Sequence, residues 1–264
     1  MSFEASRSAF LEKLFSWWEI NKRELPWRST KNPYYILLSE FMLIQTQVKR
    51  VIPKYSLFLE RFPEINDLAT ATNKELITLW EGLGYNRRVI WLRDICQGII
   101  NLGYFPNQPK ELKVFKGIGD YISRSIPIFA FNSDYATVDT NIRRILIYEG
   151  FVNTDAGKKE IQTVAERILP LGNSRNYHNA LMDYGSLVLT ARTTGISSLT
   201  KQNQFLGSIR ELRGNLLKLI SARTKISLSN IKKIFPDTTH DIEQVLNKMI
   251  EEKLISRNNM DYFV

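Results

Sequence analysis

Apolar residues recur every three or four positions along most of the chain, which is the spacing of one face of an α-helix. The longest such pattern covers residues 36–52 and predicts one helix, with a kink or boundary at Pro53. Alternating apolar and polar runs, which are typical of strands, are few. The pattern therefore predicts an all-α main body, with further helices over residues 55–61, 73–81, 86–101, 109–115, 120–131, 140–148, 158–168 and 177–190.

The pattern changes from about residue 204. A basic helix, LGSIRELRGNLLKLI, precedes two shorter helices, and a turn and an apolar stretch follow in SRNNMDYFV. Three helices and then a short hairpin are the outline of a winged helix. From residue 201 onward, 11 Lys and Arg residues stand against 7 Asp and Glu residues. A DNA-binding module and a helical packing cap for the main body both fit this region.

Composition narrows the class of protein. The 264 residues carry a net charge of +9, which suits binding to a polyanion such as nucleic acid. No run approaches the ~20 apolar residues of a membrane span, and the first residues lack the layout of a signal peptide. One cysteine, Cys96, and two histidines argue against a dedicated metal centre. We expect a cytoplasmic, nucleoid-associated protein, or a nuclear one in a eukaryote.

Two motifs carry candidate chemistry. KGIG, with Gly117 and Gly119, lies between two predicted helices and forms the turn of a helical hairpin, whose outward amides suit a phosphate. We expect Pro127 to kink or shorten the second helix of this hairpin. Asp139, in ATVDTNIRRILI, lies between a short β-favouring run and a helix, where it can cap the helix.

These motifs are part of a longer series: LPWR, NPYYILLSEFMLIQTQV, FPEINDLATA, LWEGLGYNRR, KGIGDY, VDTNIRRIL and HNALMDYG. The series resembles the helix-hairpin-helix DNA glycosylases of the endonuclease III superfamily, above all the mismatch-specific branch of MutY-type adenine and archaeal thymine/uracil glycosylases. The resemblance covers about residues 25–191 and implies a two-domain helical fold that binds DNA with one base flipped out. It implies a six-helix domain over 28–136, a second helical domain from 1–27 and 137–200, and a winged-helix-like region over 204–264.

The resemblance assigns two catalytic acids. Asp139 matches the family's catalytic aspartate, which stabilises positive charge on the sugar, either electrostatically or through a covalent intermediate. Glu40 matches the acid of the mismatch branch. Its apolar neighbours on the predicted helix, Ile36, Leu43 and Ile44, independently indicate a raised pKa, as a general acid needs. Glu40 would protonate adenine as the leaving base; for thymine or uracil it could position water or protonate the base.

The resemblance also implies residues that contact DNA. Gln45 matches a side chain that wedges into the duplex, and Asn179 falls where the family contacts the flipped base. Asn86 stands at the position that probes the partner base. Contacts to the DNA backbone are expected from the hairpin turn and from nearby arginines: Gly117, Ile118, Gly119, Arg87, Arg143 and Arg144.

Three departures from the family bear on function. LVLTARTTGISSLT, after MDYG, contains no cysteine, so we expect no iron–sulfur cluster and no other cofactor. Tyr121, the third candidate catalytic residue, follows the hairpin glycines as in thymine-mismatch relatives, and because a phenol cannot form a Schiff base we expect no efficient strand cleavage. Asn86 replaces the second tyrosine of the family's GLGYY, and the C-terminal region looks too short for the large domain of adenine glycosylases.

These departures favour a monofunctional DNA N-glycosylase of base excision repair that removes thymine or uracil opposite guanine. Removal of adenine opposite guanine or oxidised guanine is the alternative, favoured by Glu40 within SEFMLIQTQV. A non-catalytic protein that binds mismatched or modified DNA is a third hypothesis, against which the presence of both Glu40 and Asp139 argues. The expected partner is double-stranded DNA with a mismatch, bound by a monomer, without a membrane or a metal.

Overall fold

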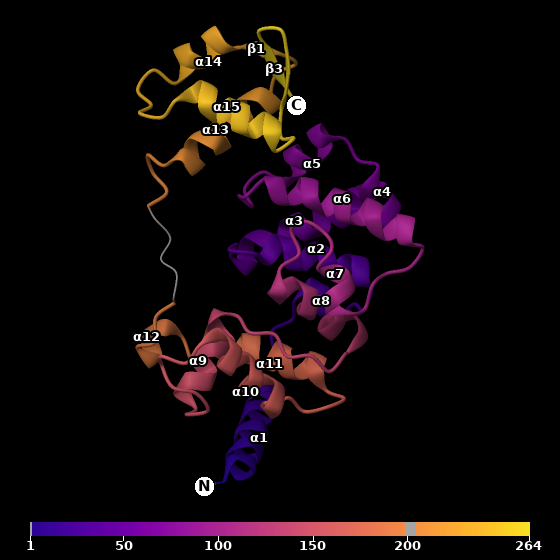
Figure 1. Ribbon diagram of the computed structural model, residues 1–264, viewed down its shortest axis with the longest axis vertical. Coiled ribbons are helices and arrows are strands. Elements are labelled where there is room, and N and C mark those ends of the chain that lie inside the picture. Colours follow the sequence, from indigo (N-terminus) through magenta and orange to yellow (C-terminus); the bar gives the residue numbers. More distant parts are fainter. Residues whose placement is uncertain (1, 199–203) are drawn as a thin grey trace. The chain divides into compact units, whose positions relative to one another are not determined.

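The computed structural model describes residues 2–198 and 204–264 as a mostly helical protein, which confirms the predicted fold class (Figure 1). No helix in these residues is long and apolar enough to cross a membrane. The described elements are α1 (Phe3–Asn21), the 3₁₀-helix η1 (Pro26–Arg28), α2 (Pro33–Leu43), α3 (Val48–Arg61), α4 (Ile65–Ala69), α5 (Asn73–Trp80), α6 (Arg87–Leu102), α7 (Pro109–Leu112), α8 (Asp120–Phe131), α9 (Thr140–Tyr148), α10 (Lys158–Ile168), α11 (Ser174–Leu187), α12 (Ala191–Thr194), α13 (Ile209–Ser221), β1 (Ile226–Ser227), α14 (Leu228–Ile234), α15 (Ile242–Glu251), β2 (Ser256–Asn258) and β3 (Asp261–Phe263).

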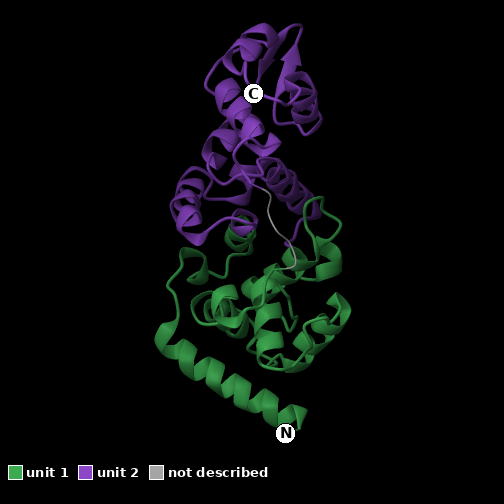
Figure 2. Ribbon diagram, turned by 90° about the vertical axis from the view of Figure 1, so that its left-hand side faces the viewer, with its two compact units in different colours: residues 1–40, 106–201 green, residues 41–105, 202–264 purple. Residues whose placement is uncertain are grey.

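The chain forms two compact units, and each combines two separate stretches of sequence (Figure 2). Unit 1 contains residues 1–40 and 106–201, and unit 2 contains residues 41–105 and 202–264. These units divide the chain at other places than the domains implied by the family resemblance. The division into 28–136, 1–27 with 137–200, and 204–264 stays a prediction.

The core of unit 1 brings α1, α9, α10 and α11 together. Helix α11 packs against both α9 and α1. Leu14 of α1, Ile145 of α9 and Ala180 of α11 are fully buried in this one core. Burial of the apolar face of α9 fixes the direction of that helix, and with it the position of Asp139 immediately before its first residue.

A buried ion cluster ties the LPWR segment to α11 within unit 1. The Asp183 carboxylate is fully buried and accepts hydrogen bonds from both terminal nitrogens of Arg28, at 2.7 and 2.9 Å, and from the Trp18 indole at 2.9 Å. Burial raises the pKa of Asp183, but Arg28 and Arg23 outweigh it and hold the pKa below its usual range. The LPWR and MDYG motifs are therefore in direct contact, through Arg28 of the first and Asp183 of the second.

The C-terminal region belongs to unit 2 and packs onto α5 through α13. Its elements follow the order α13, β1, α14, α15, β2, β3, and the strands form an antiparallel sheet in the order β1-β3-β2. The Asn73 side chain of α5 also donates to the Lys253 carbonyl at 2.9 Å. This arrangement is the outline of a winged helix, with an extra strand, β1, that is too short for its alternation to be visible in the sequence.

The prediction of one helix over 36–52 is wrong, and α3 has no boundary at Pro53; a kink there, the other alternative, stays a prediction. Residues 44–47 form a turn between α2 and α3, where Gln45 adopts a left-handed φ of 53°. Helix α3 continues through Pro53, and α8 likewise continues through Pro127 over 12 residues. A proline inside a helix removes one backbone hydrogen bond, and here the apolar faces of both helices are buried and maintain them.

Candidate active site

Glu40 lies on α2 with only 6% of its surface exposed. Its carboxyl accepts hydrogen bonds from the side chains of Ser125 and Tyr121, both on α8. Burial raises the pKa of Glu40 to about 7; the nearby Asp139 adds to the rise and the two hydroxyls oppose it. Glu40 can therefore hold or release a proton near neutral pH, as a general acid must. We call Glu40, Tyr121, Ser125 and Asp139 the acid cluster.

Helix α8 presents Tyr121 and Ser125 together because residues four apart lie on the same face of a helix. The helix follows the KGIG turn, in which Gly117 has a φ of 99° that suits glycine. Gly119 is the N-cap of α8, and Asp120, the first helical residue, forms an ion pair with a lysine across the hairpin. The hairpin therefore sets the direction in which Tyr121 enters the acid cluster.

Asp139 caps the N-terminus of α9. Its Oδ1 accepts a hydrogen bond from the Ile142 amide at 2.8 Å, and its Oδ2 accepts one from the Asn141 side chain at 3.3 Å. The side chain is half-buried, and burial raises its pKa although these donors oppose the rise. The amide of Thr137 donates to His178 Nε2 at 3.2 Å and anchors the segment before the helix. The carboxyl of Asp139 is thus held in a fixed direction.

The three titratable groups of the cluster have different proton affinities. Burial and the negative charges of Glu40 and Asp139 raise the pKa of Tyr121 well above its usual range, so the phenol stays protonated and donates to Glu40. Glu40 titrates at about 7. Burial also raises the pKa of Asp139, but there backbone amides and Arg144 oppose the rise, and two carboxyls in such different environments can take separate roles as proton donor and as charge stabiliser.

Three of the residues predicted to contact DNA belong to unit 2. Gln45 is exposed in the turn between α2 and α3, and Asn86 is the N-cap of α6. The guanidinium of Arg87 lies 4.2 Å from the centre of the Trp91 ring and 3.4 Å from a carboxylate oxygen of Glu252. Their roles as wedge, partner-base probe and phosphate contact stay predictions, and all three residues line one pocket of unit 2.

Asn179, the residue predicted to read the flipped base, is 8% exposed on α11. Its backbone carbonyl accepts a hydrogen bond from Arg28 at 3.5 Å. In the part of the chain that the structure describes, no hydrogen bond joins its amide side chain to the acid cluster, and its role in base recognition stays a prediction. The same holds for the backbone contacts predicted for Gly117, Ile118 and Gly119.

Arg144 is 7% exposed, and its contacts favour a bracing role over the predicted phosphate contact. Its guanidinium donates to four acceptors: Asn141 Oδ1 at 2.9 Å and the carbonyls of Gly185, Leu189 and Ile196 at 3.4, 3.1 and 3.3 Å. Two of these, Leu189 and Ile196, belong to the cysteine-free segment after MDYG, and Gly185 is the last residue of MDYG, so Arg144 ties both to α9. Through Asn141, the brace also reaches Asp139.

We expect Arg144→Gln to lower the free energy of unfolding by about 2–4 kcal/mol, because glutamine leaves several buried carbonyls without a donor. Urea titration measures the loss. Arg143→Gln is the matched control: Arg143 is half-buried on the same helix and donates to one carbonyl, that of Thr154, at 2.9 Å. Equal losses for the two variants would contradict the bracing role. The predicted phosphate contact of Arg143 stays open.

Sequence reasoning missed three members of this site. Ser125 follows Tyr121 by four residues, and that helical spacing could have revealed it. His178 is 1% exposed and its pKa is lowered to about 4 by burial, so it is neutral; its Nδ1 donates to the Ser174 carbonyl at 2.7 Å. No local signal indicates that His178 and Asn141 position the segment around Asp139, because those contacts arise only in the folded chain.

The described residues offer no group of three or more His, Cys, Asp or Glu side chains that could hold a metal ion. Cys96 is fully buried in α6, and burial raises the pKa of its thiol.

Known proteins resemble the chain in sequence and in fold. Residues 38–171 match the family described as HhH-GPD superfamily base excision DNA repair protein. The chain is 29% identical to the adenine DNA glycosylase of Mycolicibacterium smegmatis over 93% of this chain and 92% of that protein. It is 36% identical to the adenine DNA glycosylase of Buchnera aphidicola over 68% of this chain and 52% of that protein.

Two solved structures share the fold. A thermostable thymine-DNA glycosylase superimposes with a TM-score of 0.66 and 25% identity, covering 72% of this chain and 91% of that one. An endonuclease III trapped as a covalent intermediate with DNA superimposes with a TM-score of 0.64 and covers 73% of this chain and 90% of that one. At 19% identity, the second likeness concerns the fold alone.

Proposed function

The chain belongs to the HhH-GPD superfamily of base excision DNA repair proteins and is a DNA glycosylase, and we propose that it removes adenine opposite guanine or oxidised guanine. This reverses the order of substrates that the sequence motifs favoured. Relatives named adenine DNA glycosylase support the change. The M. smegmatis relative aligns over 92% of its own length, so the short C-terminal region no longer argues against adenine.

The pKa of Glu40 is the observation that carries this proposal. Adenine is a poor leaving group as an anion, so its departure from the sugar needs a proton on the base. A buried carboxyl whose pKa is about 7 can supply that proton at neutral pH, which an ordinary exposed glutamate cannot. The hydroxyl of Tyr121 hydrogen-bonds to Glu40 and orients it.

Asp139 acts on the sugar in this proposal. As the glycosidic bond breaks, positive charge develops on the sugar, and a carboxylate at the start of α9 stabilises it or bonds to it. The hydrogen bonds from Ile142 and Asn141 hold the carboxylate in place before the reaction begins. Water then completes the hydrolysis and leaves an abasic site in the DNA.

A panel of labelled duplexes with A·G, A·oxidised-guanine, T·G and U·G pairs tests the substrate. Alkali cleaves the strand wherever a base has been removed. We expect product from the two adenine duplexes. Product from T·G and U·G alone would refute the choice of adenine, and product from none of the four would require a different base.

Thymine or uracil opposite guanine is the second candidate, and Tyr121 is the observation that favours it. Its phenol lies beside Glu40 and offers both a ring face and a hydroxyl to a flipped pyrimidine. The thermostable thymine-DNA glycosylase that shares this fold, at 25% identity, supports the same candidate. The duplex panel separates the two candidates directly.

We expect no covalent trapping with DNA when borohydride is added during the reaction. Borohydride reduces a Schiff base between a lysine amine and the sugar, and Tyr121 supplies a phenol instead of that amine. Denaturing gel electrophoresis of a labelled duplex measures the trapped complex. Tyr121→Lys serves as a comparison that could gain trapping. Trapping by the wild-type protein at the rate of base removal would contradict the prediction.

A further inference from the structure

The hairpin before the acid cluster holds an exposed acid at the place where the sequence predicts a phosphate contact. Asp120 is the first residue of α8 and follows Gly119, the N-cap, which has no side chain to accept hydrogen bonds from the amides of the first turn. The N-terminus of a helix attracts anions, because its free amides and its dipole carry partial positive charge. Asp120 therefore supplies from within the chain the kind of charge that a DNA phosphate would bring.

Three cations from three segments surround the Asp120 carboxylate. Lys113, which follows α7, forms an ion pair with it across the hairpin. Arg124, one turn further along α8, and Lys158, the first residue of α10, lie close enough to act on it by their charge. The hydrogen bond and the charge of Lys113, and then the charges of the other two, lower the pKa of Asp120, so the carboxylate is ionised at neutral pH.

The stretch of chain around the hairpin is otherwise basic. Residues 110–124 contain four basic residues and two acids: Lys110, Lys113, Lys116, Arg124, Glu111 and Asp120. Glu111 is half-buried, whereas Asp120 is exposed. Asp120 thus places a negative charge on the surface that the hairpin offers to DNA, and this charge repels a phosphate.

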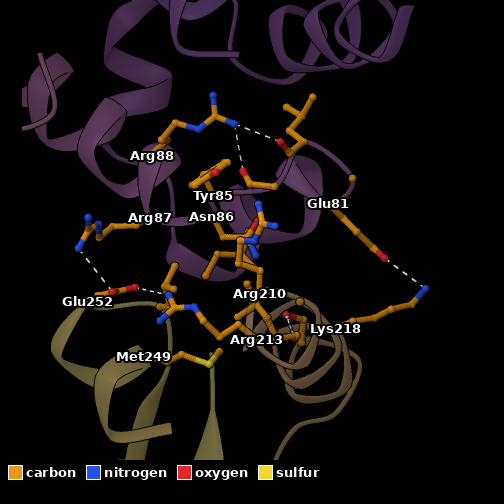
Figure 3. Close-up of a pocket in the computed structure, with 18 of the residues that line it drawn as sticks. Glu81, Tyr85, Asn86, Arg87, Arg88, Arg210, Arg213, Lys218, Met249 and Glu252 are labelled. Carbon is orange, nitrogen blue, oxygen red and sulfur yellow. Dashed lines mark hydrogen bonds and ion pairs between the residues drawn. The ribbon is translucent and has the colours of Figure 1, made fainter. Parts of the chain in front are cut away.

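The ion pair of Asp120 differs from ion pairs that hold the fold together. Figure 3 shows Glu252 in unit 2, whose carboxylate is shared between Arg87 and Arg213 and whose side chain is 12% exposed. The side chain of Asp120 is 85% exposed, and that of Lys113 is 44% exposed. Exposed pairs contribute little to stability, so a phosphate can replace Asp120 as the partner of Lys113.

We propose that Asp120 limits the affinity of the hairpin for DNA: its carboxylate holds Lys113 while the protein is free, and a DNA phosphate must displace it. This rests on the DNA glycosylase function. A glycosylase has to leave paired DNA and its own product, and a hairpin that held every phosphate tightly would slow both steps. Because phosphates carry no sequence information, the charge of Asp120 opposes binding wherever the hairpin meets DNA.

The displaced carboxylate stays near the bound phosphate, because its backbone is part of α8. Removal of its charge should therefore favour binding in two ways. No ion pair has to be broken in the free protein, and no like charge remains beside the phosphate in the complex. An acid that only stabilised the start of α8 would behave differently, since its removal would loosen the hairpin and weaken binding.

The test measures binding to a fully paired duplex, from which no base is removed. We expect Asp120→Asn to lower the Kd by about three- to tenfold and to slow dissociation by a similar factor. The slope of log Kd against log salt concentration should rise by about 0.9, because Lys113 then meets the DNA without a counter-charge of its own. Fluorescence anisotropy of a labelled duplex measures the Kd, and a chase with unlabelled duplex measures dissociation.

Lys113→Gln supplies a second measurement. In the wild-type background it should raise the Kd by no more than about twofold, because Lys113 gains the phosphate only by giving up Asp120. In the Asp120→Asn background that offset is gone, and the same substitution should raise the Kd by about five- to tenfold.

Glu4→Gln is the matched control. Glu4 is an exposed acid in the first turn of α1, outside the hairpin, and pairs with Arg7 at 3.9 Å. The variant removes one negative charge, as Asp120→Asn does, and should leave the Kd within about twofold of wild type, because solvent and salt screen distant surface charges.

Equal changes in Kd for Asp120→Asn and Glu4→Gln would overturn the proposal, because net charge alone would then explain the effect. Weaker or unchanged binding of Asp120→Asn would also overturn it, and so would equal effects of Lys113→Gln in the two backgrounds. The duplex contains no mismatch, so failure of the adenine assignment in the duplex panel would leave these results standing.

Discussion

Glu40→Gln is expected to slow the removal of adenine by about 10²–10⁴-fold, the usual contribution of a general acid. Glutamine keeps the shape and polarity of the side chain but has no proton to give. Single-turnover rates with an A·G duplex measure the loss. Full activity of Glu40→Gln would refute its role as the acid.

The pH dependence of the rate distinguishes an acid from a structural glutamate. The active form is protonated, so the wild-type rate should fall as pH rises through about 7, while the residual rate of Glu40→Gln should not follow this curve. Ser125→Ala is the companion variant. Ser125 lowers the pKa of Glu40, so its removal should move the fall in rate to higher pH. An unmoved curve would mean that another group titrates.

The raised pKa of Glu40 also predicts that the stability of the wild-type protein depends on pH, and that Glu40→Gln, although less active, becomes the more stable protein as pH rises. Between pH 4.5 and about 7 the folded protein holds a proton on Glu40 that the unfolded chain releases, so stability falls as pH rises through this range. Glutamine does not titrate, so Glu40→Gln should not lose stability in this way as pH rises. Relative to wild type, the variant should gain up to about 3 kcal/mol between pH 4 and pH 8, which urea titrations at both pH values measure.

The sequence indicates the acids of the site well because each has a local signature. Glu40 stands among apolar residues at helical spacing, and Asp139 precedes a helix at a capping position. The contacts that bring these acids into one site come from residues far apart in the sequence. Ser125 and Tyr121 reach Glu40 only because the hairpin sets α8 beside the end of α2, and no pattern within either segment states that pairing.

The two predictions that the structure does not support, one helix over 36–52 and a phosphate contact for Arg144, also fail because of contacts between distant residues. Apolar spacing runs unbroken through residues 44–47, so it predicts one helix where the chain turns at Gln45. That turn is maintained by Arg88, a residue more than 40 positions away. The resemblance likewise predicts a phosphate contact for Arg144, although the fold surrounds it with carbonyls of Gly185, at the end of MDYG, and of Leu189 and Ile196 in the segment after it. Distant carbonyl partners leave no mark in a local pattern.

Asp139→Asn is expected to reduce base removal by at least about 10³-fold and to leave DNA binding within a few-fold of wild type. Asparagine is as good an N-cap as aspartate, so α9 should keep its start and its hydrogen bond from the Ile142 amide. What the variant loses is the negative charge that faces the developing positive charge on the sugar. Single-turnover kinetics and a binding titration with the same duplex measure the two effects separately.

Asp241→Asn provides the matched control for this charge. Asp241 is the N-cap of α15 and accepts hydrogen bonds from the amides of Glu243 and Gln244, so the same substitution is made at the same kind of capping position. The free energy of unfolding of both variants should lie within about 1 kcal/mol of the wild-type value. Only Asp139→Asn should lose base removal. If Asp139→Asn retained more than a tenth of the wild-type rate, Asp139 would be a helix cap and no more, and the charge on the sugar would need another source of stabilisation.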